Sequence, residues 1–245
     1  MDVGRKGCDS VVCVFKVTPQ PQGISTKQLV NIYTISDAHF EDQAIWVKKL
    51  FYKYKAKRLI VDGNGMGIGF VDYLVKPQID PDTNEVWPDF GVYGGTQDDA
   101  VDEYKKYRTA NCEQDALYIV KANAPVNNEA HSNAQSQLSS GKVKLLIDER
   151  VAKVKLMGTK MGQNMTPEKR AEYLKPFTLT SILKEEMMNL REENEGVNII
   201  LKQANKGIRK DKFSAFEYGL YYIKLEEDNK KKKKKFNAAD WAFFN

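Results

Sequence analysis

Residues 58–69, RLIVDGNGMGIG, decide the fold class. An apolar run, Leu59 to Val61, ends at Asp62 and is followed by a glycine-rich turn. A short run that is apolar on both faces is typical of a central parallel strand covered by helices. A polar residue at its carboxyl end stands where open α/β sheets place their ligands. This stretch therefore predicts an α/β fold with Asp62 close to a functional site.

The flanking sequence supplies more elements of both kinds. Apolar and β-branched runs predict strands at 11–17, 28–35, 116–121, 142–147 and 197–202, the first two as an antiparallel pair. Helical spacing predicts helices at 39–55, 70–75, 127–140, 166–194 with an interruption near Pro176, and from residue 211. Residues 77–115 hold ten acidic and three basic residues and predict an acidic surface excursion. Together these elements predict a mixed sheet flanked by helices.

The composition excludes several classes of protein. With 245 residues, 42% of them hydrophobic, the chain is globular rather than disordered. No apolar run approaches the roughly 18–20 residues of a membrane span, and the opening residues lack the apolar core of a secretory signal. Three cysteines and two histidines form no zinc motif and favour a reducing compartment. The net charge of +5 includes six consecutive lysines, 230–235, so only local basic patches bear on nucleic-acid binding.

Three aspartates stand at positions where chemistry is often found. Asp2 precedes a glycine turn and a strand, Asp62 ends the central strand, and Asp211 opens the last long helix. Converging carboxylates are hard ligands for Mg²⁺ or Mn²⁺, and paired ions of this kind hydrolyse phosphodiesters. Each has an ordinary reading too, because Asp211 can simply favour a helix N-terminus and Asp62 can be a turn residue. Asp2 alone indicates little.

The glycine-rich turn does not match a nucleotide-binding loop. Residues 63–69 carry neither the Lys nor the Ser or Thr of a Walker A motif, and Ile68 breaks the pattern GxGxxG. Close packing of the backbone between strand and helix accounts for the glycines.

Three segments together resemble the nuclease domain of bacteriophage terminase large subunits. They are DVGRKGCDSVV (2–12), LIVDGNGMGIGFVDYL (59–74) and GIRKDKFSAFEYGLYYI (207–223). The resemblance implies an RNase H-like fold over residues 1–225, with antiparallel first strands and parallel later strands. Residues 226–245 would then form a Lys-rich and aromatic C-terminal tail, which either docks on the portal or packs back on the domain.

The same resemblance implies a metal-dependent endonuclease. In this family three acidic residues hold two Mg²⁺ or Mn²⁺ ions, and the matching positions are Asp2, Asp62 and Asp211, with Asp9 assisting. One ion would activate water and the other would stabilise the leaving 3′-oxygen. The enzyme would cut concatemeric viral DNA to start and end genome packaging. A histidine that some relatives carry near the third aspartate is absent here.

A nuclease must also hold the phosphate backbone, so we expect double-stranded DNA as partner with low sequence specificity. The candidate DNA contacts are Arg5, Lys6, Lys206, Arg209, Lys210 and Lys212. A second basic patch could also contact DNA, but an ordinary solvated face explains it at least as well. It comprises Lys142, Lys144, Lys153, Lys155 and Lys160. The resemblance further implies a longer protein in the host cytoplasm, whose ATPase domain lies outside this chain and which works with a small terminase and a portal.

Other classes stay open at this point. Another RNase H-like nuclease, such as a Holliday-junction resolvase, would use similar carboxylates. A sugar kinase or actin-like ATPase shares the opening D-x-G but needs a second phosphate loop that the sequence lacks. A catalytically silent module that binds DNA or portal would keep the fold alone.

Overall fold

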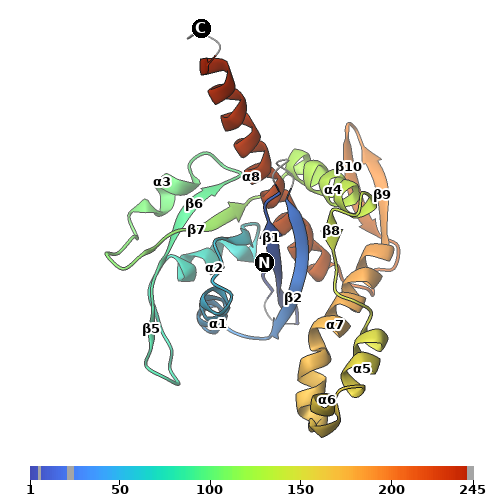
Figure 1. Ribbon diagram of the computed structural model, residues 1–245. Coiled ribbons are helices and arrows are strands. Elements are labelled where there is room, and N and C mark those ends of the chain that lie inside the picture. The colour runs from blue at the N-terminus through green and yellow to red at the C-terminus, as the bar shows by residue number, and fades with distance from the viewer. Residues whose placement is uncertain (5–6, 21–24, 242–245) are drawn as a thin grey trace. The chain divides into compact units, whose positions relative to one another are not determined.

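The computed structural model describes residues 1–4, 7–20 and 25–241, with side chains up to residue 232 (Figure 1). The chain divides into two compact units. The first unit comprises Met1–Val12 and Thr34–Asn128, and the second comprises Cys13–Tyr33 and Glu129–Asn245. Strands and helices alternate through both units, which confirms the predicted mixed α/β class. The division differs from the single domain predicted over residues 1–225.

The first unit is built on a parallel sheet with the order β3-β7-β6. These strands are β3 (Leu59–Asp62), β7 (Glu113–Val120) and β6 (Phe90–Gly95). Met1 joins this sheet beside β3: its nitrogen donates to the Ile60 carbonyl, and the Asp62 N–H donates to the Met1 carbonyl at 3.0 Å. This exchange is the parallel pattern and pairs Met1 with Val61. The predicted central strand is thus confirmed, with neighbours on both sides.

Asp2 links this sheet to β1 (Asp9–Thr18). The backbones of Asp2 and Val11 exchange two hydrogen bonds, of 3.0 and 2.9 Å, in an antiparallel bridge. β1 pairs in turn with β2 (Thr26–Ser36). Because only residues 19–25 join β1 to β2, the two strands run antiparallel; a parallel return needs a crossover of a dozen residues or more. The predicted antiparallel opening matches this pairing, and β3, β7 and β6 are parallel as predicted, but the later strands 78–79 and 86–87 pair antiparallel, as do 190–195 and 198–203.

Two helices bury apolar faces in the first unit: α1 (Phe40–Lys53) and α2 (Met66–Leu74). Ser10 of β1 faces α1, because its hydroxyl donates to Gln43 Oε1 at 2.6 Å. The Gln43 amide donates in turn to the carbonyls of Gly4 and Ala38. This buried polar chain ties the opening turn to α1. The core around it is apolar: Val61, Phe70, Val71, Leu74, Leu117, Ile119 and Val120.

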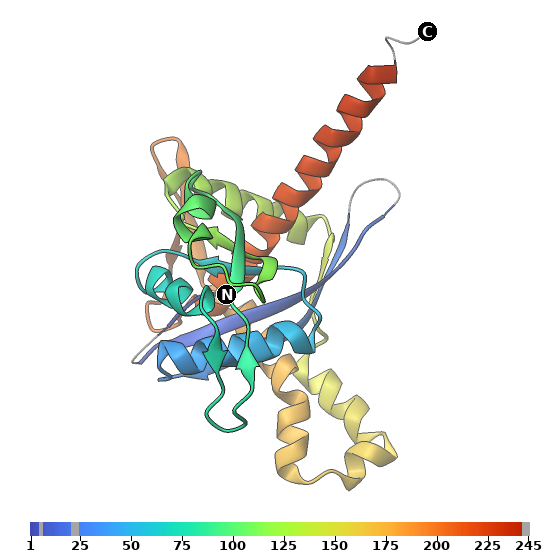
Figure 2. The same cartoon turned by 90° about the vertical axis from the view of Figure 1, so that its left-hand side faces the viewer.

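The predicted surface excursion at 77–115 is only partly correct. The segment supplies β6 to the parallel sheet, and Phe90 and Val92 are buried. It also contains α3 (Ala100–Lys105) and the short antiparallel strands β4 (Gln78–Ile79) and β5 (Val86–Trp87). The sequence prediction missed β6 because its apolar residues are few and glycines interrupt them. We call residues 77–87 the β4–β5 finger; it extends beyond α1 in Figure 2.

The second unit is organised around α8 (Asp211–Trp241). Phe216 of α8 lies against Phe15 of β1, with ring centroids 5.4 Å apart. Gly219 permits this approach, since a Cβ there would lie 2.7 Å from the Phe15 ring. Residues 213–223 are buried on all sides of the helix, as expected of a helix in a core. α8 continues to Trp241, so the lysine run at 230–235 is helical and most of the predicted separate tail belongs to this helix. Phe243 and Phe244 of that tail lie outside the described residues.

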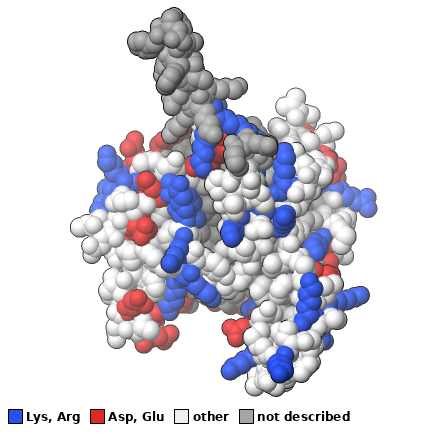
Figure 3. Space-filling model, in the orientation of Figure 1, with Lys and Arg blue, Asp and Glu red and all other residues white. Residues whose placement is uncertain are grey.

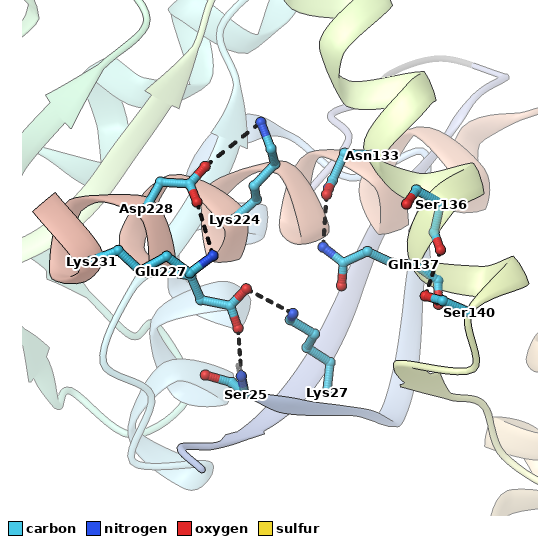
Figure 4. A network of polar contacts seen from close by, with 10 residues as sticks. All are labelled: Ser25, Lys27, Asn133, Ser136, Gln137, Ser140, Lys224, Glu227, Asp228 and Lys231. Carbon is cyan, nitrogen blue, oxygen red and sulfur yellow. Dashed lines mark hydrogen bonds and ion pairs between the residues drawn. The ribbon is translucent and has the colours of Figure 1, made fainter. Parts of the chain in front are cut away.

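Polar contacts pin the far part of α8 to β2 (Figure 4). Lys27 is buried, and its ammonium lies 2.9 Å from Glu227 Oε2. Glu227 Oε1 accepts from the Ser25 N–H at 2.8 Å. The helix α4 (Ala124–Ser139) contributes His131, whose Nδ1 lies 2.5 Å from Glu217. β8 (Val143–Lys144) adds a short parallel strand to β2.

A helical arm and a hairpin complete the second unit. The arm consists of α5 (Glu149–Met157), α6 (Lys160–Asn164) and the first turns of α7 (Pro167–Met188). The hairpin pairs β9 (Leu190–Glu195) with β10 (Asn198–Gln203). The predicted interruption at Pro176 is wrong, because α7 continues through it. No helix among the described residues is both long and apolar enough to span a membrane.

A buried lysine holds the base of the β4–β5 finger. Lys48 of α1 is fully buried, and its ammonium donates to the carbonyls of Lys76 and Pro88, each at 2.7 Å. These two residues flank the finger on either side, so one charged group clamps both of its ends. Desolvation lowers the pKa of Lys48 from 10.5 to about 7, although Asp89 and Cys112 nearby act in the opposite direction.

This lowered pKa predicts how stability depends on pH. Between about pH 7 and about pH 9 the unfolded lysine keeps a proton that the folded state loses, so the free energy of unfolding rises with pH. Above that range the Cys112 thiol ionises in the unfolded chain but keeps its proton in the folded protein, because burial raises its pKa from 9.0 to about 12. This difference lowers the free energy of unfolding as the pH increases further. Lys48→Met should abolish the rise in chemical denaturation, whereas Lys53→Met, exposed on the same helix, should keep it. Parallel curves for wild type and Lys48→Met would contradict the prediction.

Candidate metal site

Two of the predicted carboxylates lie side by side in the first unit. Met1 pairs with Val61 in parallel register, so the next residues, Asp2 and Asp62, stand opposite each other. Opposed residues on neighbouring strands, about 4.8 Å apart, point their side chains to the same face. The backbone pairing therefore brings Asp2 and Asp62 together at the carboxyl end of β3.

The side chain of Asp9 lies on the same face of β1 as the side chain of Val11, the residue that pairs with Asp2. Asp2 pairs with Val11, and side chains alternate along a strand, so Asp9 and Val11 share a face. Ser10, between them, turns the other way toward α1. Asp9 Oδ1 accepts a hydrogen bond from the Ser36 hydroxyl at 2.6 Å. Sequence reasoning missed Ser36, since a serine near a strand end carries no signal of its own.

The glycine-rich turn fixes the Asp62 carboxylate. Asp62 Oδ1 accepts from the Asn64 N–H at 2.9 Å, which closes an Asx-type turn. Gly65 then takes a φ of 52°, in the left-handed region that favours glycine. Gly67 packs directly on the strand end, because a Cβ there would lie 1.7 Å from the Asp62 carbonyl oxygen. The expected role in close backbone packing is confirmed for Gly67, whereas Gly65 has open space where a Cβ would lie.

Gly67 and Gly69 form a matched pair that tests this packing. Gly67→Ala forces the turn and Asp62 to move and should cost about 1–3 kcal/mol of unfolding free energy. Gly69→Ala, where the added Cβ meets only Phe40 at 3.5 Å, should be neutral or stabilising. Thermal denaturation of the two variants measures the difference. Equal melting temperatures would show that the strand end tolerates displacement.

Asp211, the third predicted carboxylate, belongs to the second unit. It occupies the first turn of α8, where its charge favours the helix N-terminus. Arg209 approaches it, with Nη1 3.9 Å from Oδ2. Sequence reasoning anticipated this position at a helix start.

Lys212, predicted as a DNA contact, is a structural residue. Its side chain is buried, and its ammonium lies 3.2 Å from Glu186 Oε1 of α7. Glu186 Oε2 accepts from the Phe213 N–H at 2.9 Å, so this carboxylate anchors the start of α8. Burial raises the pKa of Glu186 despite the nearby lysine and N–H. The Lys212 ammonium is thus taken up by an ion pair inside the fold, with a partner 26 residues away that the sequence alone does not indicate.

The other predicted basic contacts fall into three groups. Lys206, Arg209 and Lys210 are exposed in the loop before α8. Arg5 and Lys6 lie outside the described residues. The second basic patch was predicted on a strand or hairpin, but most of it is helical: Lys153 and Lys155 lie on α5 and Lys160 on α6.

A pair of neighbouring lysines tests this assignment. Lys212→Met leaves the Glu186 carboxylate buried without its cation, which should cost about 3 kcal/mol of unfolding free energy. Lys210→Met, two residues earlier and exposed, should leave the free energy of unfolding unchanged. Urea denaturation distinguishes the two. A stable Lys212→Met protein would mean that Glu186 needs no cationic partner.

The carboxylate pair fits a hard cation in ligand type. Mg²⁺ keeps several waters and is usually bound through one or two carboxylates together with substrate phosphates. Within residues 1–4, 7–20 and 25–241, no three His, Cys, Asp or Glu side chains gather as a set that could hold a metal ion. If Asp2 and Asp62 hold a metal ion, they would do so as two carboxylates without a third ligand of these types among the described residues.

Comparisons with models of protein families, with curated proteins and with solved structures found no significant match.

Proposed function

We propose that this chain is a metal-dependent DNA endonuclease domain of the RNase H-like type, related in function to the nuclease of terminase large subunits. The observation that carries the proposal is the register that sets Asp2 opposite Asp62 at the carboxyl end of β3. Carboxylates paired in this way are the ligands that Mg²⁺ and Mn²⁺ prefer.

The strand arrangement supports the proposed fold type. The opening strands pair antiparallel, Asp2 with β1 and β1 with β2, and the later strands β3, β7 and β6 are parallel. This is the arrangement that the sequence resemblance implies. Asp2 therefore lies between β1 and β3, with Val11 paired to it on one side and Asp62 opposite it on the other.

The roles of the residues follow from their positions. Asp2 and Asp62 would hold a divalent ion between them, with water and substrate phosphate as its other ligands. When bound, such ions lower the pKa of water and stabilise a leaving alkoxide. The Asn64 N–H and the packing of Gly67 fix the orientation of Asp62 before any ligand binds.

Positive charge near Asp211 would hold the DNA backbone. Lys206, Arg209 and Lys210 precede Asp211 in sequence, so cations and a carboxylate belong to one loop. Phosphate contacts supply affinity without sequence information, so cleavage should show little base preference. Terminases act within packaging assemblies, and the portal, a small terminase and an ATPase domain are the partners that this proposal implies.

Cleavage of supercoiled plasmid in Mn²⁺ or Mg²⁺ tests the proposal. Wild-type protein should nick and linearise the plasmid, and EDTA should prevent it. Asp2→Asn and Asp62→Asn remove a ligand charge without changing side-chain volume and should reduce the rate by about 100-fold or more. Isothermal titration of Mn²⁺ should show correspondingly weaker binding.

Asp98→Asn is the matched control, because Asp98 is an exposed aspartate of the same first unit. It should cleave and bind Mn²⁺ like the wild type. Full activity in Asp62→Asn, with an unchanged melting temperature, would refute the metal site. A folded wild-type protein that binds neither Mn²⁺ nor Mg²⁺ would instead favour a silent DNA-binding or portal-binding module.

A further inference from the structure

The first unit exposes an apolar pair on the β4–β5 finger. Ile79 and Val86 are direct cross-strand partners, and they are 60% and 62% exposed. The finger carries three acidic residues and no basic one. Asp80 is buried against Lys49, whereas Asp82 and Glu85 are exposed toward the tip. Figure 3 shows acidic atoms gathered over this part of the surface.

The finger is held in shape although its strands are only two residues long. A two-stranded ribbon alone is marginally stable in water. Here Asp80 exchanges backbone hydrogen bonds with the tip, donating to Glu85 and accepting from Asn84, and its carboxylate accepts from the Asp82 N–H. Lys48 clamps the two flanking segments. A preformed surface loses little conformational entropy when it binds a partner.

The helical arm of the second unit presents the complementary surface. Val154 is 73% exposed at the centre of the outer face of α5. Val151 and Met157, both exposed, lie three residues before and after it, so the three form one apolar stripe. Ala152 and Leu156 point the other way, into a small core with Leu174. The arm therefore has a stable interior and an apolar outer ridge.

Basic side chains border this ridge. Asp148 caps α5 by accepting from the Arg150 N–H at 2.9 Å, and Glu168 lies in the first turn of α7. Two of the arm's acidic groups thus face helix N-termini, which offset their charge. Figure 3 shows basic atoms over the arm. Four basic residues of α5 and α6 form no ion pair with any residue that the structure describes: Arg150, Lys153, Lys155 and Lys160.

We infer that the β4–β5 finger of one copy of this chain docks on the helical arm of another copy. Each surface has an apolar centre and a charged border, and the two borders have opposite sign. An apolar core with a polar rim is the usual anatomy of a protein–protein interface. The two surfaces differ, so the contact is heterologous and joins copies head to tail.

DNA is a less suitable occupant of the arm. Phosphate contacts would use the exposed cations of the arm but would leave its apolar stripe, Val151, Val154 and Met157, uncovered. A second copy accounts for the apolar and the basic residues at once, and also for the exposed pair on the finger. The inference does not depend on the proposed nuclease activity, since it uses neither Asp2 nor Asp62.

Sedimentation velocity of the intact chain, free of nucleic acid and in EDTA, tests the contact. The mean mass should rise above that of the monomer with increasing concentration at low salt, and high salt should reduce it. Val154→Asp should weaken association about tenfold or more. Val197→Asp is the control: Val197 is 96% exposed at the β9–β10 turn, and its change should have no effect. A wild type that stays monomeric at all concentrations would overturn the inference.

Charge reversal provides a test that loss of folding cannot imitate. The arm variant, Lys153→Glu with Lys155→Glu, and the finger variant, Asp82→Lys with Glu85→Lys, should each fail to self-associate. Mixed together they should associate again, because each reversed surface then meets its complement. Absence of association in the mixture, with both variants folded, would contradict the docking. A monomeric wild type whose arm variant loses DNA binding would assign the arm to DNA instead.

Discussion

The backbone pairing of Met1 and Asp2 is the constraint on which the first unit depends. Met1 extends the parallel sheet beyond β3, and Asp2 exchanges hydrogen bonds with Val11 of β1. These two residues therefore provide backbone hydrogen-bond partners for β3 on one side and for β1 on the other. They also set the register, and a slip of one residue would turn Asp2 to the opposite face, away from Asp62. The candidate site therefore depends on the register in which Met1 and Asp2 pair with β3 and β1.

In each unit, buried charges act as anchors of the fold. Lys48 gives up solvent to hold the two ends of the finger, and Lys212 and Glu186 hold the first turn of α8. A buried charge is costly unless it is paired or hydrogen-bonded, so each marks a place where the fold requires one geometry. The finger and the arm show the opposite case, since their apolar residues Ile79, Val86 and Val154 are exposed to solvent in the isolated chain.

Much of the fold was predictable from local patterns. The run ending at Asp62 predicted its strand, and the helices at 39–55 and 127–140 were placed within a few residues. β6 escaped because Phe90 and Val92 are too few to show periodicity between glycines. The helix α5 was not predicted because it alternates lysine with apolar residues, a pattern that also suits an exposed strand.

The sequence by itself determined the α/β class, the strand that ends at Asp62 and the close packing of its glycine turn, since each depends on residues near one another in the chain. The tertiary structure decided that Asp2 stands opposite Asp62, that Lys212 is buried against Glu186, and that Lys48 clamps the finger. Those pairings join residues 26 to 60 positions apart, and strand register and burial, rather than local propensity, select such partners.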